Sequence, residues 1–146
     1  MSSMVSLRAL EDIADATQLA INFGSDAFKL ALFTDSLTTP DPETFTAYNV
    51  APFNANESAA GGGYSAGGVA LVSPAWGIQA GTGRVRYKTN SLTIAGVTLA
   101  VRWLLHYDDT VSDRAWYVCD LGAEYTLTGE DANITVDGNG WFRYRF

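Results

Sequence analysis

Apolar and polar residues alternate along most of the second half of the chain, and this pattern predicts β-strands. The predicted strands are residues 83–87, 91–94, 98–107, 115–121, 125–128, 133–136 and 141–146. Segments rich in Gly, Asp and Asn separate several of them, and such residues favour turns. Short strands at this spacing indicate a mainly β fold, either an antiparallel β-sandwich or an open barrel.

Strand signals are fewer in the first half of the chain. Residues 28–34 are apolar on both faces, which is typical of a central strand, and residues 66–72 predict one more strand. Between them, residues 35–66 carry three prolines and a triple glycine and lack a strand pattern that would bury them in their own core. A loop of this length in a compact domain is often functional, and such segments often become ordered only on binding.

Helical spacing appears near the N-terminus, where Leu10, Ile13 and Ala14 fall on one face. We expect a short helix within an N-terminal arm of residues 1–23, ahead of a β domain of residues 24–146. An isolated helix shorter than ~12–15 residues is marginal in water. The arm is therefore expected to dock, either beneath its own sandwich or on a neighbouring subunit.

The composition argues against two classes of partner, nucleic acids and membranes. The 146 residues are 47% hydrophobic and only 17% charged, with a net charge of −7. Lys and Arg number nine and form no basic run, so we expect no direct contact with nucleic acid. No stretch approaches the ~20 apolar residues that span a bilayer, so we expect no membrane contact. The low charged fraction fits a surface covered by partner subunits, or a β domain rich in Ser, Thr and Gly.

Candidate catalytic residues are scarce. His106 is the only histidine and Cys119 is the only cysteine. A catalytic histidine needs a nucleophile or a carboxylate within reach, and no nucleophile motif accompanies His106. A standard zinc site needs three or four ligands, which one His and one Cys do not supply. We therefore expect His106 to lie at a solvent edge or to be packed, and Cys119 to be a small residue of the core. We expect no enzyme activity and no cofactor.

Two other features leave alternatives open. Asp108, Asp109 and Asp113 cluster in one predicted turn, which favours a solvated hairpin loop over a calcium site, because the spacing differs from that of an EF-hand. Trp76 lies next to Pro74 and Gly77 and not within a predicted strand as the other tryptophans do, so it could form a sugar-binding platform with tyrosines of the loops.

The lone cysteine cannot form an internal disulfide, and we expect the chain to fold in a reducing compartment.

Four short motifs follow one another in the β domain. They are residues 29–34 (Lys-Leu-Ala-Leu-Phe-Thr), residues 63–68 (Gly-Tyr-Ser-Ala-Gly-Gly), the aromatic strand of residues 102–108, and residues 120–122 (Asp-Leu-Gly). In this order they resemble a family of small structural proteins from tailed bacteriophages, over about residues 24–146. The resemblance implies a β-rich component of the virion, folded in the host cytoplasm, that works by binding other virion proteins.

From this resemblance we expect a capsid decoration (cement) protein or a minor capsid protein, with the major capsid protein as a partner and with homo-oligomers. A tail, neck or fibre component is the first alternative, and a carbohydrate-binding β module is the second. The arm and the long loop are the segments expected to reach neighbours. The expected contact residues are Leu7, Leu10, Ile13, Phe45, Tyr48 and Phe53.

Overall fold

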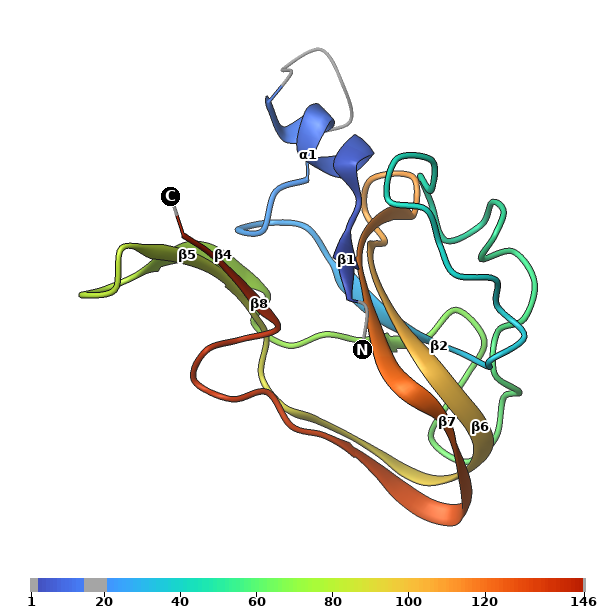
Figure 1. Cartoon of the computed structure of the whole chain (residues 1–146). Helices are drawn as coiled ribbons and strands as arrows, with labels where there is room; N and C mark the ends of the chain where they lie inside the picture. The colour runs from blue at the N-terminus through green and yellow to red at the C-terminus, as the bar shows by residue number, and fades with distance from the viewer. Residues whose placement is uncertain (1–2, 15–20, 146) are drawn as a thin grey trace.

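The computed structural model describes residues 3–14 and 21–145, which form two antiparallel β-sheets and one short helix (Figure 1). In chain order the elements are β1 (Met4–Val5), α1 (Leu7–Ala14), β2 (Phe28–Phe33), β3 (Val69–Ala70), β4 (Ala75–Gln79), β5 (Arg84–Lys88), β6 (Leu92–Asp108), β7 (Arg114–Ile134) and β8 (Phe142–Arg145). The prediction of a mainly β, antiparallel fold with a minor N-terminal helix is confirmed.

The larger sheet has five strands in the order β1-β7-β6-β2-β3, and the smaller has three in the order β4-β5-β8. The central place predicted for β2 is confirmed, because it lies between β3 and β6. Its two faces belong to different cores. Phe28, Leu30 and Leu32 pack in the core shared with the smaller sheet, whereas Ala31 and Phe33 pack in the core beneath the long loop.

β6 and β7 form one long hairpin, where the sequence pattern predicts five separate strands over residues 91–136. Their pairing continues as far as Leu92 and Ile134, with several shifts of register on the way. At two of these shifts Gly122 and Gly129 adopt φ values of 86° and 68°, and β7 carries extra residues. The glycines that resemble strand ends in the sequence are therefore β-bulges inside a continuous strand.

Beyond the five-stranded sheet the hairpin continues as a curved ribbon, which we define as residues 92–101 and 121–134 (Figure 1). Among the described strands, these two segments pair only with each other. The ribbon bends away from the larger sheet and leads into β5 and β8. This bend brings the smaller sheet back over one face of the larger sheet, so that the two sheets share a core.

Aromatic side chains fill the space between the two sheets. The smaller sheet contributes Trp76, Tyr87 and Phe142, and the larger sheet contributes Trp116 and Tyr117. The ring centroids of Tyr117 and Phe142 are 4.9 Å apart, and those of Trp76 and Trp116 are 5.8 Å apart. Strand β4, which the sequence pattern does not predict, is anchored to this core by the ring of Trp76.

The long loop covers the opposite face of the larger sheet. Its residues Leu37, Phe45 and Phe53 are at most 2% exposed, and they pack in one cluster with Phe33 and Trp103. The prediction that this loop lacks contacts with its own core is therefore wrong. Single aromatic residues, spaced without strand periodicity, are enough to hold it on the sheet. Trp103 is buried, as the strong apolar pattern of its strand predicts.

The described part of the N-terminal arm packs on its own domain. β1 extends the larger sheet at β7, with Met4 opposite Val118 and Val5 opposite Tyr117. In α1, Ala9 is fully buried. The arm was expected to dock beneath its own sandwich or on a neighbouring subunit, and these residues show the first.

Replacing Ser6 with Ala should lower the free energy of unfolding by about 1 kcal/mol, the usual cost of losing a helix N-cap. Ser6 precedes the first residue of α1, and its Oγ accepts a hydrogen bond from the N–H of Ala9 at 3.2 Å. The same hydroxyl donates to the carbonyl of Phe45 at 3.1 Å, so it also ties the arm to the long loop. Urea unfolding measures the change against the exposed Ser36→Ala, and equal midpoints for the two variants would contradict this role.

Candidate functional site

His106 lies fully buried in the aromatic core between the sheets. Its ring centroid is 4.3 Å from that of Trp141 and 5.3 Å from that of Tyr117. Its Nδ1 is 3.1 Å from the hydroxyl oxygen of Tyr87, so the pair links β6 to β5. Burial lowers the pKa of His106 to about 3, and the ring is therefore neutral near pH 7. Of the two positions expected for this histidine, the structure shows the packed one and not the solvent edge.

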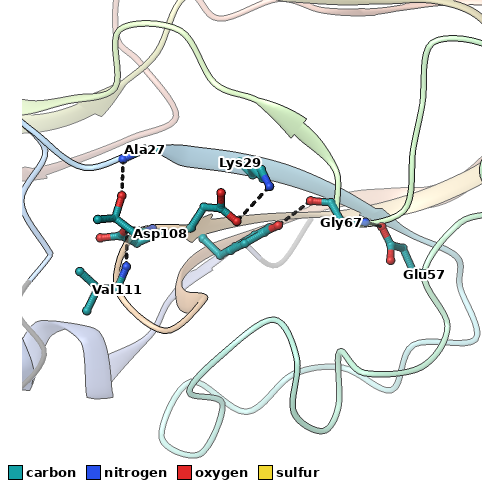
Figure 2. Close-up of polar contacts among 9 residues, drawn as sticks. Ala27, Lys29, Glu57, Gly67, Asp108 and Val111 are labelled. Carbon is teal, nitrogen blue, oxygen red and sulfur yellow. Dashed lines mark hydrogen bonds and ion pairs between the residues drawn. The ribbon is translucent and has the colours of Figure 1, made fainter.

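Asp108 ends β6 and is also buried. One carboxylate oxygen accepts hydrogen bonds from the N–H groups of Thr110 and Val111, at 2.8 and 3.1 Å (Figure 2). These bonds shape the turn that leads into β7. Burial raises the pKa of Asp108 to about 6, and the nearby carboxylate of Asp26 adds to the rise. Asp108 thus stabilises a turn but carries a charge that is costly to bury at neutral pH.

Further polar contacts fasten the end of β6 to β2 and to the long loop (Figure 2). Lys29 on β2 forms an ion pair with Asp109 at 2.9 Å. The hydroxyl of Tyr107 donates to the carbonyl of Gly67, whose N–H donates to Glu57 at 2.9 Å. The two aspartates after Tyr107 are thus engaged in a turn and in an ion pair. Among the described residues, no group of three or more His, Cys, Asp or Glu could hold a metal ion.

Glu57 is the acceptor that holds the long loop together. Its carboxylate accepts hydrogen bonds from the hydroxyls of Tyr48 and Tyr64, at 2.6 and 2.7 Å. The hydroxyl of Tyr64 in turn accepts from the N–H of Leu32 at 2.8 Å. Burial raises the pKa of both tyrosines, so their hydroxyls remain donors to the carboxylate at neutral pH. This network fixes the loop on the sheet, which is a structural task.

A groove of about 430 Å³ opens where the curved ribbon bends. Its lining is mainly apolar and includes Leu104, Leu121, Tyr125, Leu127 and Trp141. Tyr125 is 53% exposed, so the groove offers an aromatic side chain to solvent. A concave apolar site of this volume can take a small ligand or the side chains of another protein.

The groove lies beside an unpaired strand edge. On the β6 side the long loop supports the ribbon, since the N–H of Gly63 donates to the carbonyl of Ala95 at 2.8 Å and the hydroxyl of Ser58 donates to that of Ala100 at 2.6 Å. On the β7 side, β6 is the only described strand that pairs with residues 121–134. An open edge next to exposed apolar surface is typical of a site that binds another chain.

The loop residues predicted as subunit contacts do not lie at this groove. Phe45 and Phe53 are buried in the core beneath the loop, which corrects the prediction that they contact another subunit. Tyr48 is half-buried, and its ring stacks on that of Tyr107 with 4.7 Å between the centroids. All three aromatic side chains serve the attachment of the loop to its own sheet.

The arm residues predicted as contacts have different places. Leu7 is 48% exposed, whereas Leu10 is half-buried and packs against the core between the sheets. The side chain of Ile13 lies outside the described residues. Sequence reasoning missed the groove residues Tyr125 and Leu127, because only the bend of the ribbon exposes them beside an open edge. Their alternation along one strand was the signal present in the sequence.

The groove and the open edge are the features of the described residues that bear most directly on function. Within that part of the chain, no helix has the length and apolar character needed to cross a bilayer. Comparison of the chain with protein-family models, with curated proteins and with solved structures finds no match.

Proposed function

We propose that the protein is a structural subunit of a bacteriophage virion, a capsid decoration or minor capsid protein that binds neighbouring virion proteins. The observation that carries the proposal is the apolar groove beside the edge of residues 121–134 of β7, which pairs with no described strand other than β6. A neighbouring subunit would insert apolar side chains into this groove and cover Tyr125. The motifs at residues 29–34 and 63–68, which resemble those of phage structural proteins, support the choice of assembly.

The architecture suits a subunit that works through contact. A two-stranded ribbon is marginally stable alone in water, so it needs support from other elements. The long loop supplies that support along β6, and Glu57 holds the loop in place. The other edge and the groove remain available to a neighbour. The ribbon would therefore offer one strand edge and the groove to a neighbouring subunit.

Three side chains that could carry other functions are engaged within the fold, whereas Cys119 is partly buried and lines the groove. His106 fills the aromatic core, and Asp108 holds a turn. The ring of Trp76, the candidate sugar platform, packs against those of Trp116 and Phe142, with centroids 5.8 and 5.7 Å apart. A sugar could stack on Trp76 only by competing with these contacts. The groove is thus better placed than Trp76 to bind a partner.

Location in the particle tests the assignment directly. Particles purified from the source of the chain can be labelled with an antibody raised against the folded protein and viewed by electron microscopy. We expect label distributed over the head. Label confined to the tail, neck or fibres would replace the capsid assignment with that alternative. Purified particles that lack the protein altogether would overturn the proposal.

The groove itself can be tested with a matched pair of variants. Replacing Tyr125 with Ser should reduce binding to particles at least about tenfold, because it removes the exposed aromatic side chain at the groove. Val72→Ser is the control, since Val72 is 54% exposed, similar to Tyr125, and does not line the groove. Both variants should keep the wild-type melting temperature. Equal binding by the two variants would show that the groove is not the contact.

A further inference from the structure

Most of the basic residues of this chain meet on the smaller sheet. β5 and β8, which are far apart in the sequence, carry Arg84, Arg86, Lys88, Arg143 and Arg145. These are five of the nine Lys and Arg residues, and residues 75–91 and 138–146 contain no Asp or Glu. The rest of the chain contains the other four basic residues and all 16 acidic residues, so its net charge is −12.

Strand register places this charge on the face that points away from the core. Tyr87 is buried between the sheets, so its neighbours Arg86 and Lys88 belong to the opposite face. Arg143 lies directly opposite Arg86 on the neighbouring strand. We call Arg84, Arg86, Lys88 and Arg143 the basic face. Lys88 and Arg143 are exposed, and the two others are partly exposed.

Among the described residues, no ion pair neutralises the charges of the basic face. The ion pairs in this part of the chain use Arg8, Lys29 and Arg102, which lie elsewhere. Arg86 donates to the carbonyl of Gly138, and Arg143 donates to Oδ1 of Asn139 at 2.7 Å. Both acceptors are neutral groups.

Like charges opposite each other on neighbouring strands destabilise a sheet. The fold accepts this arrangement at Arg86, which lies opposite Arg143. Beside this pair, a hollow of about 210 Å³ is lined by Gly77, Arg86 and Lys88 among others. A Cβ built at Gly77 would meet no atom within 4 Å. The surface is therefore open to an incoming carboxylate, and a counter-charge there would relieve the repulsion.

We propose that the basic face docks on an acidic surface of a second copy of this chain. The acidic surface lies at the start of the long loop, on the other side of the larger sheet from the smaller sheet (Figure 1). Residues 30–83 contain no Lys or Arg. Asp35 and Glu124 are both exposed there and adjacent, with the N–H of Asp35 donating to Glu124 at 2.8 Å. Opposite charge at opposite ends favours a head-to-tail contact, which builds rings or filaments.

Charge also decides between a second copy and a nucleic acid. Nucleic-acid-binding domains are basic overall, because long-range attraction to phosphates brings them to the duplex. Here a net charge of −12 outside the smaller sheet would repel a polyanion. A second copy, although it carries −7 overall, can place its acidic surface directly on the basic face, where the local attraction acts at contact. The inference is independent of the virion assignment, since it concerns contact between copies of this chain alone.

Sedimentation velocity of the purified full chain tests the proposal at about 0.02 M and about 0.5 M salt, because added salt screens exposed charges. We expect concentration-dependent association at low salt that weakens at least about tenfold at high salt. Arg143→Glu should abolish it. Arg8→Glu is the control, since Arg8 is also exposed, the charge change is the same and Arg8 lies on α1. Lys88→Glu repeats the test on a side chain with no hydrogen bond among the described residues, should Arg143→Glu fail to fold.

Three outcomes would overturn the proposal. One is a monomer under all conditions, and another is association that Arg143→Glu and Lys88→Glu leave unchanged. The third is binding of a fluorescent duplex DNA at low salt without self-association of the protein. If Arg143→Glu also abolished this binding, the basic face would be assigned to nucleic acid. Loss of association in Asp35→Lys would place the acidic side of the contact at the start of the long loop.

Discussion

Asp108→Asn should change how the stability of this protein depends on pH. The pKa of Asp108 is about 6 in the folded protein, against 3.8 for the free side chain. An acid whose folded pKa is raised stabilises the fold below pH 3.8, and this stability is lost as the pH rises through 6. The shift of about two units corresponds to about 3 kcal/mol. Asn removes that dependence and keeps an oxygen for the N–H groups of Thr110 and Val111.

His106 acts in the opposite direction. Burial holds its pKa at about 3, against 6.5 for the free side chain. Its contribution to stability is present above pH 6.5 and is lost as the pH falls towards 3. Between pH 4 and pH 6 the two buried groups therefore oppose each other in the wild-type protein. In Asp108→Asn only the slope of His106 remains, so acidification should destabilise this variant more steeply than the wild type.

Urea unfolding followed by tryptophan fluorescence, in steps between pH 4 and pH 7.5, measures both slopes. We expect the stability of Asp108→Asn relative to wild type to rise by up to about 3 kcal/mol from the low to the high end. His106→Phe should show the reverse trend, with stability increasing on acidification. Asp35→Asn, which removes an exposed carboxylate, should follow the wild-type profile. A profile for Asp108→Asn that parallels the wild type would show that the buried carboxyl does not titrate near pH 6.

The positions of the strands could be predicted from the sequence better than their continuity. Period-2 alternation marked β5 and β8 closely, and a run apolar on both faces marked β2, because each strand is short and has one clear pattern. In β7 the pattern is interrupted at Gly122 and Gly129, and a local reading takes each interruption as a turn. Tertiary pairing with β6 decides otherwise, since the partner strand continues past both glycines. Whether a glycine ends a strand or forms a bulge depends on its partner across the sheet.

The candidate sites depend even more on topology. Arg84 and Arg143 are 59 positions apart in the sequence, so no run of basic residues indicates the face that they share. The groove likewise needs the bend of the ribbon, which brings Leu104 and Leu127 to one lining. His106 is different, since the sequence already offered no partner for catalysis and indicated a ring that is packed or at a solvent edge. The role of a single residue could be predicted from the sequence, whereas surfaces built from several strands could not.

Phe53→Ala should be among the most destabilising single changes in the long loop. Phe53 is 1% exposed, and its ring centroid is 5.5 Å from those of both Phe33 and Phe45. Truncating a buried Phe to Ala costs about 3–5 kcal/mol, because apolar burial is lost and a cavity remains. We expect the upper part of this range if the loop stays in place over the cavity. Release of the loop would also break the contacts of Glu57 with Tyr48 and Gly67.

Urea unfolding at pH 7 tests this prediction against a control from the same loop. Val50 is 40% exposed, so Val50→Ala should change the free energy of unfolding by no more than about 0.5 kcal/mol. Limited proteolysis distinguishes the two consequences of Phe53→Ala, since a released loop is cut between β2 and β3 while the two sheets stay intact. If Phe53→Ala matches Val50→Ala in stability, the loop is not part of the core. The aromatic side chains at its centre would then be free to bind a neighbour, as the sequence pattern alone suggests.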